Sequence, residues 1–182
     1  MHNILFLSGG SLVGQNVLSA LSGRRDSLYL IAMNSQVDEP ALYDYDAVYW
    51  SPPINESPEL FNCRFEEILA LTTPDLIIPC RDDDVLFLAS LLVARPESKG
   101  KILCGPQAIA ASMLDKALSF TFSQNLGIPF APAIPTDAPW SLVQSFIAEY
   151  GFPIIAKPRK GFASGGVRIL FSANQAAPLK GN

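Results

Sequence analysis

The sequence predicts an α/β protein in which a parallel sheet over residues 1–112 is followed by a smaller α+β unit over residues 113–182. In the first part, short and continuously apolar runs alternate with segments of helical periodicity, a pattern typical of parallel strands covered by helices on both faces. After residue 112 the alternation gives way to two helices and a hairpin. We therefore expect two domains, the first with a doubly wound, Rossmann-like sheet.

Five apolar runs bounded by turn residues are the expected strands of the first part: Asn3–Leu7, Leu28–Met33, the short Ala47–Trp50, Asp75–Pro79 and Lys101–Cys104. Helices are expected between them, where apolar residues recur every three or four positions: Val13–Leu21, Phe65–Leu71 and Val85–Leu92. A further short helix is expected to start at Pro106. The prolines of residues 38–58 predict an irregular segment there.

The second part begins with an apolar stripe at four-residue spacing, from Leu114 to Leu126, which predicts one helix ended by Gly127. A second helix is expected over Leu142–Tyr150, ended by Gly151. The hairpin follows, with one apolar strand ending at Lys157 and another over Val167–Phe171. Helix, helix and hairpin are the beginning of an α+β unit.

Composition and charge narrow the function classes. Apolar residues make up 49% of the chain and charged residues 16%, as in a soluble globular protein. The net charge of −4 argues against a nucleic-acid partner. Residues 1–112 carry 7 Lys/Arg against 14 Asp/Glu, a net of −7, whereas residues 113–182 carry 6 against 3, a net of +3. The cations gather in the hairpin, as an anionic ligand would require.

Several other classes are disfavoured. The longest apolar run, Val85–Ala94, is too short to span a membrane, and the N-terminus lacks the basic region of a signal peptide, so a cytoplasmic protein is expected. Cys63, Cys80 and Cys104 have no metal-site spacing and are expected to be reduced. His2 is the one histidine, which argues against histidine-based acid–base or Ser-His-Asp chemistry.

The first glycine turn, Gly9–Gly14, resembles a dinucleotide fingerprint but departs from it. Ser11 stands where the second glycine belongs, and Asn34 rather than an acid follows the second strand, so a nicotinamide enzyme is disfavoured. The favoured interpretation is a tight strand–helix turn. The alternative is an acceptor-substrate site at the carboxyl ends of the strands, formed by Gly9, Gly10, Ser11, Arg81 and Asp83.

The stretch Phe152–Leu170 has the composition of a phosphate-binding loop. Its cations are Lys157, Arg159 and Lys160, and its small residues are Gly161, Ser164, Gly165 and Gly166. Glycines let the backbone approach an anion, and lysines supply point charges. An ordinary solvated hairpin is the alternative. Lys116, placed in the first turn of a helix against the macrodipole, is a second candidate contact to the same ligand.

One ordered series of motifs resembles the ATP-grasp superfamily: Gly105-Pro106, Leu114-Asp115-Lys116, Leu126–Pro129, Gly151–Pro158 and the glycine loop. The resemblance is closest to members like the carbamoyl-phosphate synthase large subunit and biotin carboxylase. The residues before this series resemble the pre-ATP-grasp domain of those enzymes, so the resemblance covers essentially the whole chain.

The resemblance implies an ATP-dependent ligase that activates a carboxylate as an acylphosphate, from which an amine or a thiol displaces phosphate. Lys116 and Lys157 match the two family positions that contact ATP. Gly161, Ser164, Gly165 and Gly166 match the loop that closes over the phosphates, although this loop has fewer glycines than many relatives and contains Phe162-Ala163. The implied cofactors are ATP and Mg²⁺.

The family's Mg²⁺ ligands lie in a C-terminal lobe that these 182 residues do not contain. We therefore expect the N-terminal part of a ligase, with no catalytic or metal residue of its own and no turnover alone. The alternatives are a non-catalytic nucleotide- or small-molecule-binding module and, less favoured, an NAD(P) oxidoreductase. The expected partners are small-molecule carboxylate, amine or thiol substrates. The acceptor substrate and homo-oligomer formation stay open.

Overall fold

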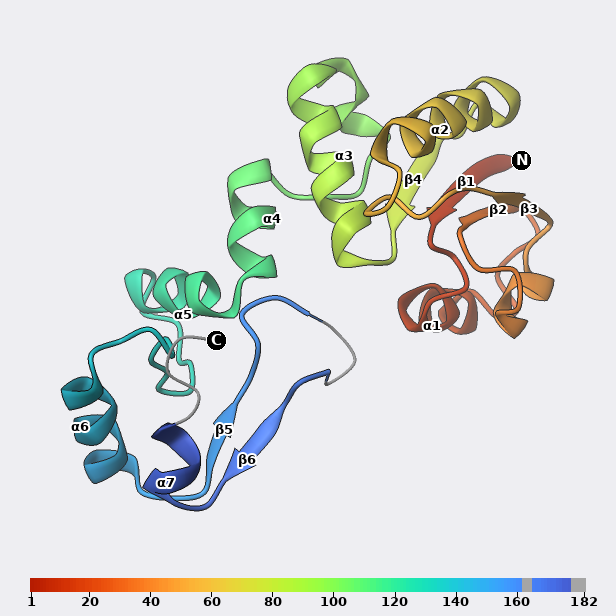
Figure 1. Ribbon diagram of the computed structural model, residues 1–182. Helices are drawn as coiled ribbons and strands as arrows, with labels where there is room; N and C mark the ends of the chain where they lie inside the picture. Colours follow the sequence, from red (N-terminus) through yellow and green to blue (C-terminus); the bar gives the residue numbers. More distant parts are fainter. Residues whose placement is uncertain (162–164, 178–182) are drawn as a thin grey trace. The chain divides into compact units, whose positions relative to one another are not determined.

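The computed structural model describes residues 1–161 and 165–177. They form two compact units, unit 1 over Met1–Ala110 and unit 2 over Ala111–Asn182. The division falls inside helix α4 (Gln107–Leu114). Each unit has its own sheet, as Figure 1 shows.

Unit 1 is built on four parallel strands: β1 (His2–Leu7), β2 (Leu28–Asn34), β3 (Ala47–Trp50) and β4 (Leu76–Pro79). Their order in the sheet is β3-β2-β1-β4, and Leu5 of β1 lies opposite both Ile31 and Ile77. The chain runs outward from β1 to β3 and then crosses to the other side of β1. This reversal places the switch point, where such sheets bind ligands, at the carboxyl end of β1. The predicted parallel α/β sheet is confirmed.

Helices cover both faces of this sheet (Figure 1). Because side chains alternate along a strand, Ile4 and Phe6 face one layer while Leu5 and Leu7 face the other. The first layer consists of α1 (Leu12–Ala20) and the 3₁₀ helix η1 (Pro40–Asp44). The second layer consists of α2 (Pro58–Thr72) and α3 (Asp82–Ala94). The two apolar layers hold the strand ends in fixed positions.

The expected strand Lys101–Cys104 is reduced to a single bridge, in which Ile102 pairs in parallel with Ile77 of β4. The 3₁₀ helix η2 (Pro96–Gly100) ends directly before it, and Pro106 follows soon after. Little extended chain is left between these turns, so the segment adds one buried side chain, Ile102, but no further strand.

Unit 2 contains α5 (Lys116–Asn125), α6 (Trp140–Tyr150) and an antiparallel pair, β5 (Ile154–Ala156) and β6 (Arg168–Leu170). A short helix, α7 (Ala173–Ala176), follows. The predicted order of helix, helix and hairpin is confirmed. The helix expected over Leu114–Leu126 is confirmed as α5, but it begins two residues later, at Lys116, because Leu114 is the last residue of α4. Asp115 separates them in an extended conformation, as the N-cap of α5.

One face of the β5–β6 pair is open. Ile155 and Ile169 lie opposite each other in the register and are 58% and 55% exposed. Leu170, the next residue along β6, points to the other face and is buried. The hairpin therefore presents a small, flat apolar surface directly before and after its loop.

The core of unit 1 can be tested on α2. Phe65 is fully buried between this helix and the sheet, whereas Leu60 on the same helix is 64% exposed. Phe65→Ala should lower the free energy of unfolding by about 3–5 kcal/mol, because it removes apolar contacts and leaves a cavity. Leu60→Ala should change it by no more than about 0.5 kcal/mol. Urea denaturation measures both, and equal losses would contradict the assigned burial.

Candidate functional site

The start of α5 is capped by the side chain of Asp115. Its Oδ1 accepts hydrogen bonds from the backbone N–H groups of Ala117 (2.9 Å) and Leu118 (3.3 Å). The free N–H groups at a helix start need such acceptors, and aspartate is among the best residues for this position. The cap places Lys116 at the first position of the helix.

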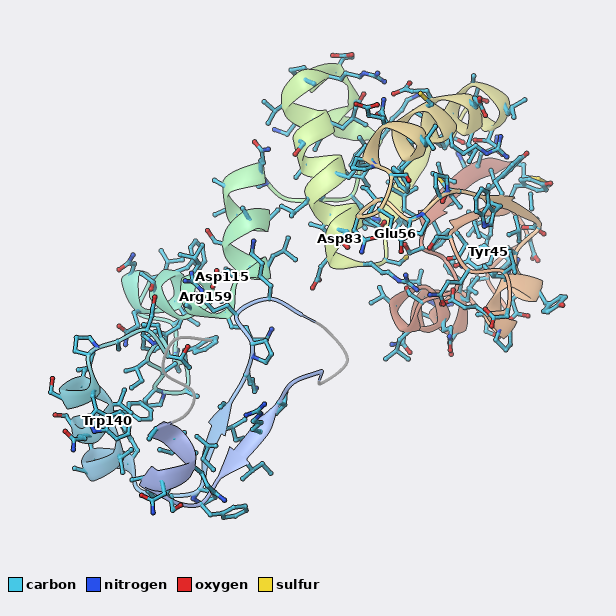
Figure 2. The ribbon with its side chains drawn as sticks, viewed as in Figure 1. Tyr45, Glu56, Asp83, Asp115, Trp140 and Arg159 are labelled. Carbon is cyan, nitrogen blue, oxygen red and sulfur yellow. The ribbon has the colours of Figure 1, made fainter. Side chains whose placement is uncertain are left out.

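The same carboxylate binds Arg159, from the segment that follows β5 (Figure 2). The arginine Nε lies 3.1 Å from Oδ1 and 3.0 Å from Oδ2, and its Nη2 lies 2.7 Å from Oδ2. Asp115 is buried, at 6% exposure. The hydrogen bond from Arg159 holds the pKa of the Asp115 carboxyl below its usual range and raises the pKa of the guanidinium. The two groups form a charged, two-pronged pair.

Lys116 adds two further contacts to the same segment. Its backbone N–H donates to the carbonyl of Arg159 (3.0 Å), and its Nζ donates to the carbonyl of Gly161 (3.1 Å). The N–H groups of Lys116, Ala117 and Leu118 are thus all bonded within the protein. An anion at this place would be held by side-chain cations and not by the helix backbone.

The remaining cations of the loop are open to solvent. Lys157 and Lys160 are exposed, and neither has a hydrogen-bond or ion-pair partner among residues 1–161 and 165–177. Gly161 has φ 131° and Gly166 has φ 71°, conformations that favour glycine. A Cβ on Gly166 would lie 2.7 Å from Cγ of Pro158, so the end of the loop approaches its beginning closely.

The structure thus brings Lys116, Arg159 and Gly161 into direct contact, with Lys157 and Lys160 in the same segment. Gly165 is exposed, and Ser164 lies outside the described residues. The sequence did not predict the pairing of Arg159 with Asp115. The adjacent residues Asp115 and Lys116 indicate a helix start, but they do not identify a partner 44 residues away.

In unit 1 the glycine turn after β1 is closely packed. Gly9 and Gly10 are buried, the Gly10 N–H donates to Asn34 Oδ1 (3.2 Å), and the Tyr45 hydroxyl donates to the Gly9 carbonyl (2.9 Å). A Cβ on Gly9 would lie 2.9 Å from both Ala32 Cβ and Tyr45 Oη. The packing alone requires glycine at this position.

The neighbouring polar residues also have partners inside unit 1. Ser11 is the N-cap of α1, and its hydroxyl donates to the Cys80 carbonyl (3.1 Å). Arg81 Nη2 lies 3.0 Å from Glu39 Oε1, and the other Glu39 oxygen accepts from Asn34 Nδ2 (2.8 Å). These contacts fix the carboxyl ends of β1, β2 and β4 relative to one another. The acceptor-substrate role of Gly9, Gly10, Ser11 and Arg81 stays a prediction.

The three aspartates that open α3 differ in environment. Asp84 is 2% exposed and accepts hydrogen bonds from the Ser8 hydroxyl (3.2 Å) and the N–H groups of Cys80 (3.3 Å) and Arg81 (3.0 Å). Burial raises the pKa of its carboxyl to about 6. Asp83 is exposed, and it lines an open groove of about 340 Å³ with Ile54, Asn55, Pro58, Leu86, Phe87 and Ser90.

Within the described part of the chain, no three His, Cys, Asp or Glu side chains converge as a metal ion would require. Among residues 1–161 and 165–177, no helix has both the length and the apolar composition of a membrane span.

No protein-family model matches the sequence. No curated protein matches it either. Solved structures do match over almost the whole chain.

The N5-carboxyaminoimidazole ribonucleotide synthetase from Thermotoga maritima has a TM-score of 0.63 and 21% identity, and the match covers 98% of this chain and 43% of that one. The biotin carboxylase domain of the Hydrogenobacter thermophilus 2-oxoglutarate carboxylase, solved with MgADP and bicarbonate, has a TM-score of 0.62 and 16% identity, and the match covers 96% of this chain and 39% of that one. The L-amino acid ligase from Bacillus licheniformis has a TM-score of 0.61 and 12% identity, and the match covers 96% of this chain and 40% of that one.

The chain therefore has the fold of the N-terminal part of ATP-grasp enzymes, as its sequence predicted. It spans about 40% of the length of these similar proteins. At identities of 12–21% the similarity establishes the fold alone.

The environment of Asp84 predicts a specific dependence of stability on pH. Since its pKa is raised from 3.8 to about 6, the unfolded chain releases this proton between pH 4 and 6 while the folded chain retains it. The free energy of unfolding therefore falls as pH rises through this window, by up to about 3 kcal/mol from this group, and levels off above it.

Asp84→Asn should remove this contribution, so the wild type should lose stability relative to the variant between pH 4 and 6 in urea denaturation. Asp83→Asn, with its exposed side chain, is the matched control and should keep the wild-type slope. If the free energies of unfolding of the wild type and Asp84→Asn changed in parallel with pH, the pKa of the Asp84 carboxyl would not be raised.

Proposed function

We propose that this chain supplies the ATP-binding N-terminal part of an ATP-dependent carboxylate ligase. The observation that carries the proposal is the junction of the α5 start with the segment Lys157–Gly161. There, Asp115 and Lys116 hold a glycine-containing loop whose exposed lysines, Lys157 and Lys160, have no protein counter-charge among the described residues. The shared fold with ATP-grasp enzymes supports it.

The residues at this junction fit a nucleoside triphosphate. Lys116, Lys157 and Lys160 offer three ammonium groups to a polyphosphate, and the absence of side chains at Gly161, Gly165 and Gly166 leaves room for its oxygens. The exposed apolar pair Ile155 and Ile169 offers a flat surface on which an adenine ring can pack, close in sequence to Lys157.

When bound, ATP supplies the phosphoryl group that converts a carboxylate into an acylphosphate, from which an amine or a thiol displaces phosphate. The lysines of the junction bind and orient the phosphates and stabilise the negative charge that shifts between their oxygens during transfer. Because no metal-binding cluster occurs in the described part of the chain, we assign no step to Mg²⁺ here.

For the acceptor substrate we propose a site at the carboxyl edge of the unit 1 sheet. Of the five residues expected there, Gly9 and Gly10 are buried and Ser11 and Arg81 are bonded within the unit. Asp83 is the exposed one, and its carboxylate lies in the apolar groove beside α3. A carboxylate next to apolar side chains favours an acceptor that carries an amine.

A titration of the ¹⁵N-labelled protein with ATP and with AMP tests the nucleotide site. ATP should shift the amide signals of Lys116 and of residues 155–161, and AMP should do so much more weakly, because most of the binding charge lies on the terminal phosphates. Lys157→Ala should weaken ATP binding by about tenfold, the effect of losing one charged hydrogen bond.

Lys99→Ala is the control, since it removes an exposed lysine from η2 of unit 1. Equal responses to ATP and AMP would contradict the proposal, as would shifts confined to Gly9–Ser11.

A further inference from the structure

We propose that Arg159 is a positioning residue that holds the segment Lys157–Gly161 through Asp115 and does not itself bind the phosphates. The first half of this statement rests on the structure alone, and the second half rests on the proposed function. It differs from the sequence-based expectation, in which Arg159 is one of several cations that contact ATP. We call this pair of side chains the Asp115–Arg159 tether.

In the tether, the donors of Arg159 and both carboxylate oxygens of Asp115 are used to bind each other. Arg159 directs Nε and Nη2 at the two carboxylate oxygens over 2.7–3.1 Å, a fork that arginine forms well and lysine cannot. Asp115 is buried, and two backbone N–H groups of α5 complete its set of donors. If Arg159 turned to a ligand, this buried carboxylate would lose its charged partner, which is unfavourable.

The tether also determines where the other cations lie. Arg159 stands between Lys157 and Gly161 in sequence, two residues from each. Its carbonyl accepts from the Lys116 N–H, and the Gly161 carbonyl accepts from Lys116 Nζ. Both contacts require that the segment remain beside the start of α5. The tether therefore keeps Lys157 and Lys116 close to one another although it touches neither ammonium group.

The charges at the junction are consistent with this division of roles. Asp115 neutralises Arg159, whereas Lys157 and Lys160 have no acidic partner in the described ranges and Lys116 contacts a neutral carbonyl. The net positive charge available to an anion thus comes from the three lysines. Arg159 holds the segment in position, and the lysines attract the anion electrostatically.

Two substitutions separate the tether from the helix cap. Asp115→Asn keeps a side-chain oxygen for the N–H groups of Ala117 and Leu118 but removes the charge that binds Arg159. Arg159→Gln removes the guanidinium and leaves the cap intact. Arg159→Lys keeps the charge without the fork. Arg168→Gln is the control, because Arg168 on β6 is exposed and has no ion pair within the described ranges.

The first measurement is amide hydrogen exchange of the free protein, followed by NMR. Asp115→Asn and Arg159→Gln should each speed exchange of the Lys116 amide, which donates to the Arg159 carbonyl, by roughly three- to tenfold. The double variant should exchange no faster than either single variant, since both remove the same interaction. The Ala117 and Leu118 amides should stay protected, and Arg168→Gln should behave as the wild type.

The second measurement is ATP affinity of the same proteins. Both tether variants should weaken ATP binding by a similar factor, the double variant by no more, and Arg159→Lys should restore part of the loss. Weaker binding in Arg159→Gln but not in Asp115→Asn would show that Arg159 contacts the nucleotide, which overturns the proposal.

Unchanged Lys116 exchange in both variants would also overturn it, whatever the affinities. If the wild type binds no ATP, the proposed function fails, while the exchange measurement still decides whether the tether exists.

Discussion

Each unit of this protein depends on the hydrogen bonds that a buried aspartate accepts at the start of a helix. Asp115 caps α5 and holds the segment after β5, and Asp84 accepts hydrogen bonds from the end of β4 and from Ser8 after β1. The carboxylates occupy similar positions but differ in charge environment. Asp115 faces a guanidinium, so its pKa falls, whereas Asp84 faces mainly neutral donors in a buried place, so its pKa rises.

The two units consequently present different surfaces to an anion. In unit 1 the glycine turn is bonded to Asn34 and Tyr45, and Arg81 is paired with Glu39, in a part of the chain that is strongly acidic overall. In unit 2 the pairing of one cation with one buried acid leaves three lysines around a glycine-containing loop. We therefore propose unit 2 as the site of a polyphosphate, and the carboxyl edge of the unit 1 sheet as the site of a ligand with a cationic group.

Much of the fold could be predicted because its signals are local. The run Ala47–Trp50 is a strand with the predicted bounds, and the apolar runs of β1, β2 and β4 differ from their expected bounds by one residue at most. The helix predicted over Leu114–Leu126 begins two residues later than expected, because the apolar spacing continues through Asp115 while that residue caps α5.

The candidate site was predicted less completely than the fold, for a related reason. Sequence placed Lys116 at a helix start and Lys157 at a strand end, since both follow from neighbouring residues. It could not show that Arg159 is neutralised, because that depends on a residue 44 positions away in the chain. Composition shows how many cations a loop has, and only the folded structure shows which of them are already paired.

The most direct test of this account is a crystal structure of the protein with a non-hydrolysable ATP analogue. The triphosphate should lie against the ammonium groups of Lys116 and Lys157, with Arg159 still bound to Asp115. A triphosphate bound at the Gly9–Ser11 turn would contradict the assignment of the nucleotide site. An Arg159 guanidinium turned from Asp115 to the phosphates would contradict the tether.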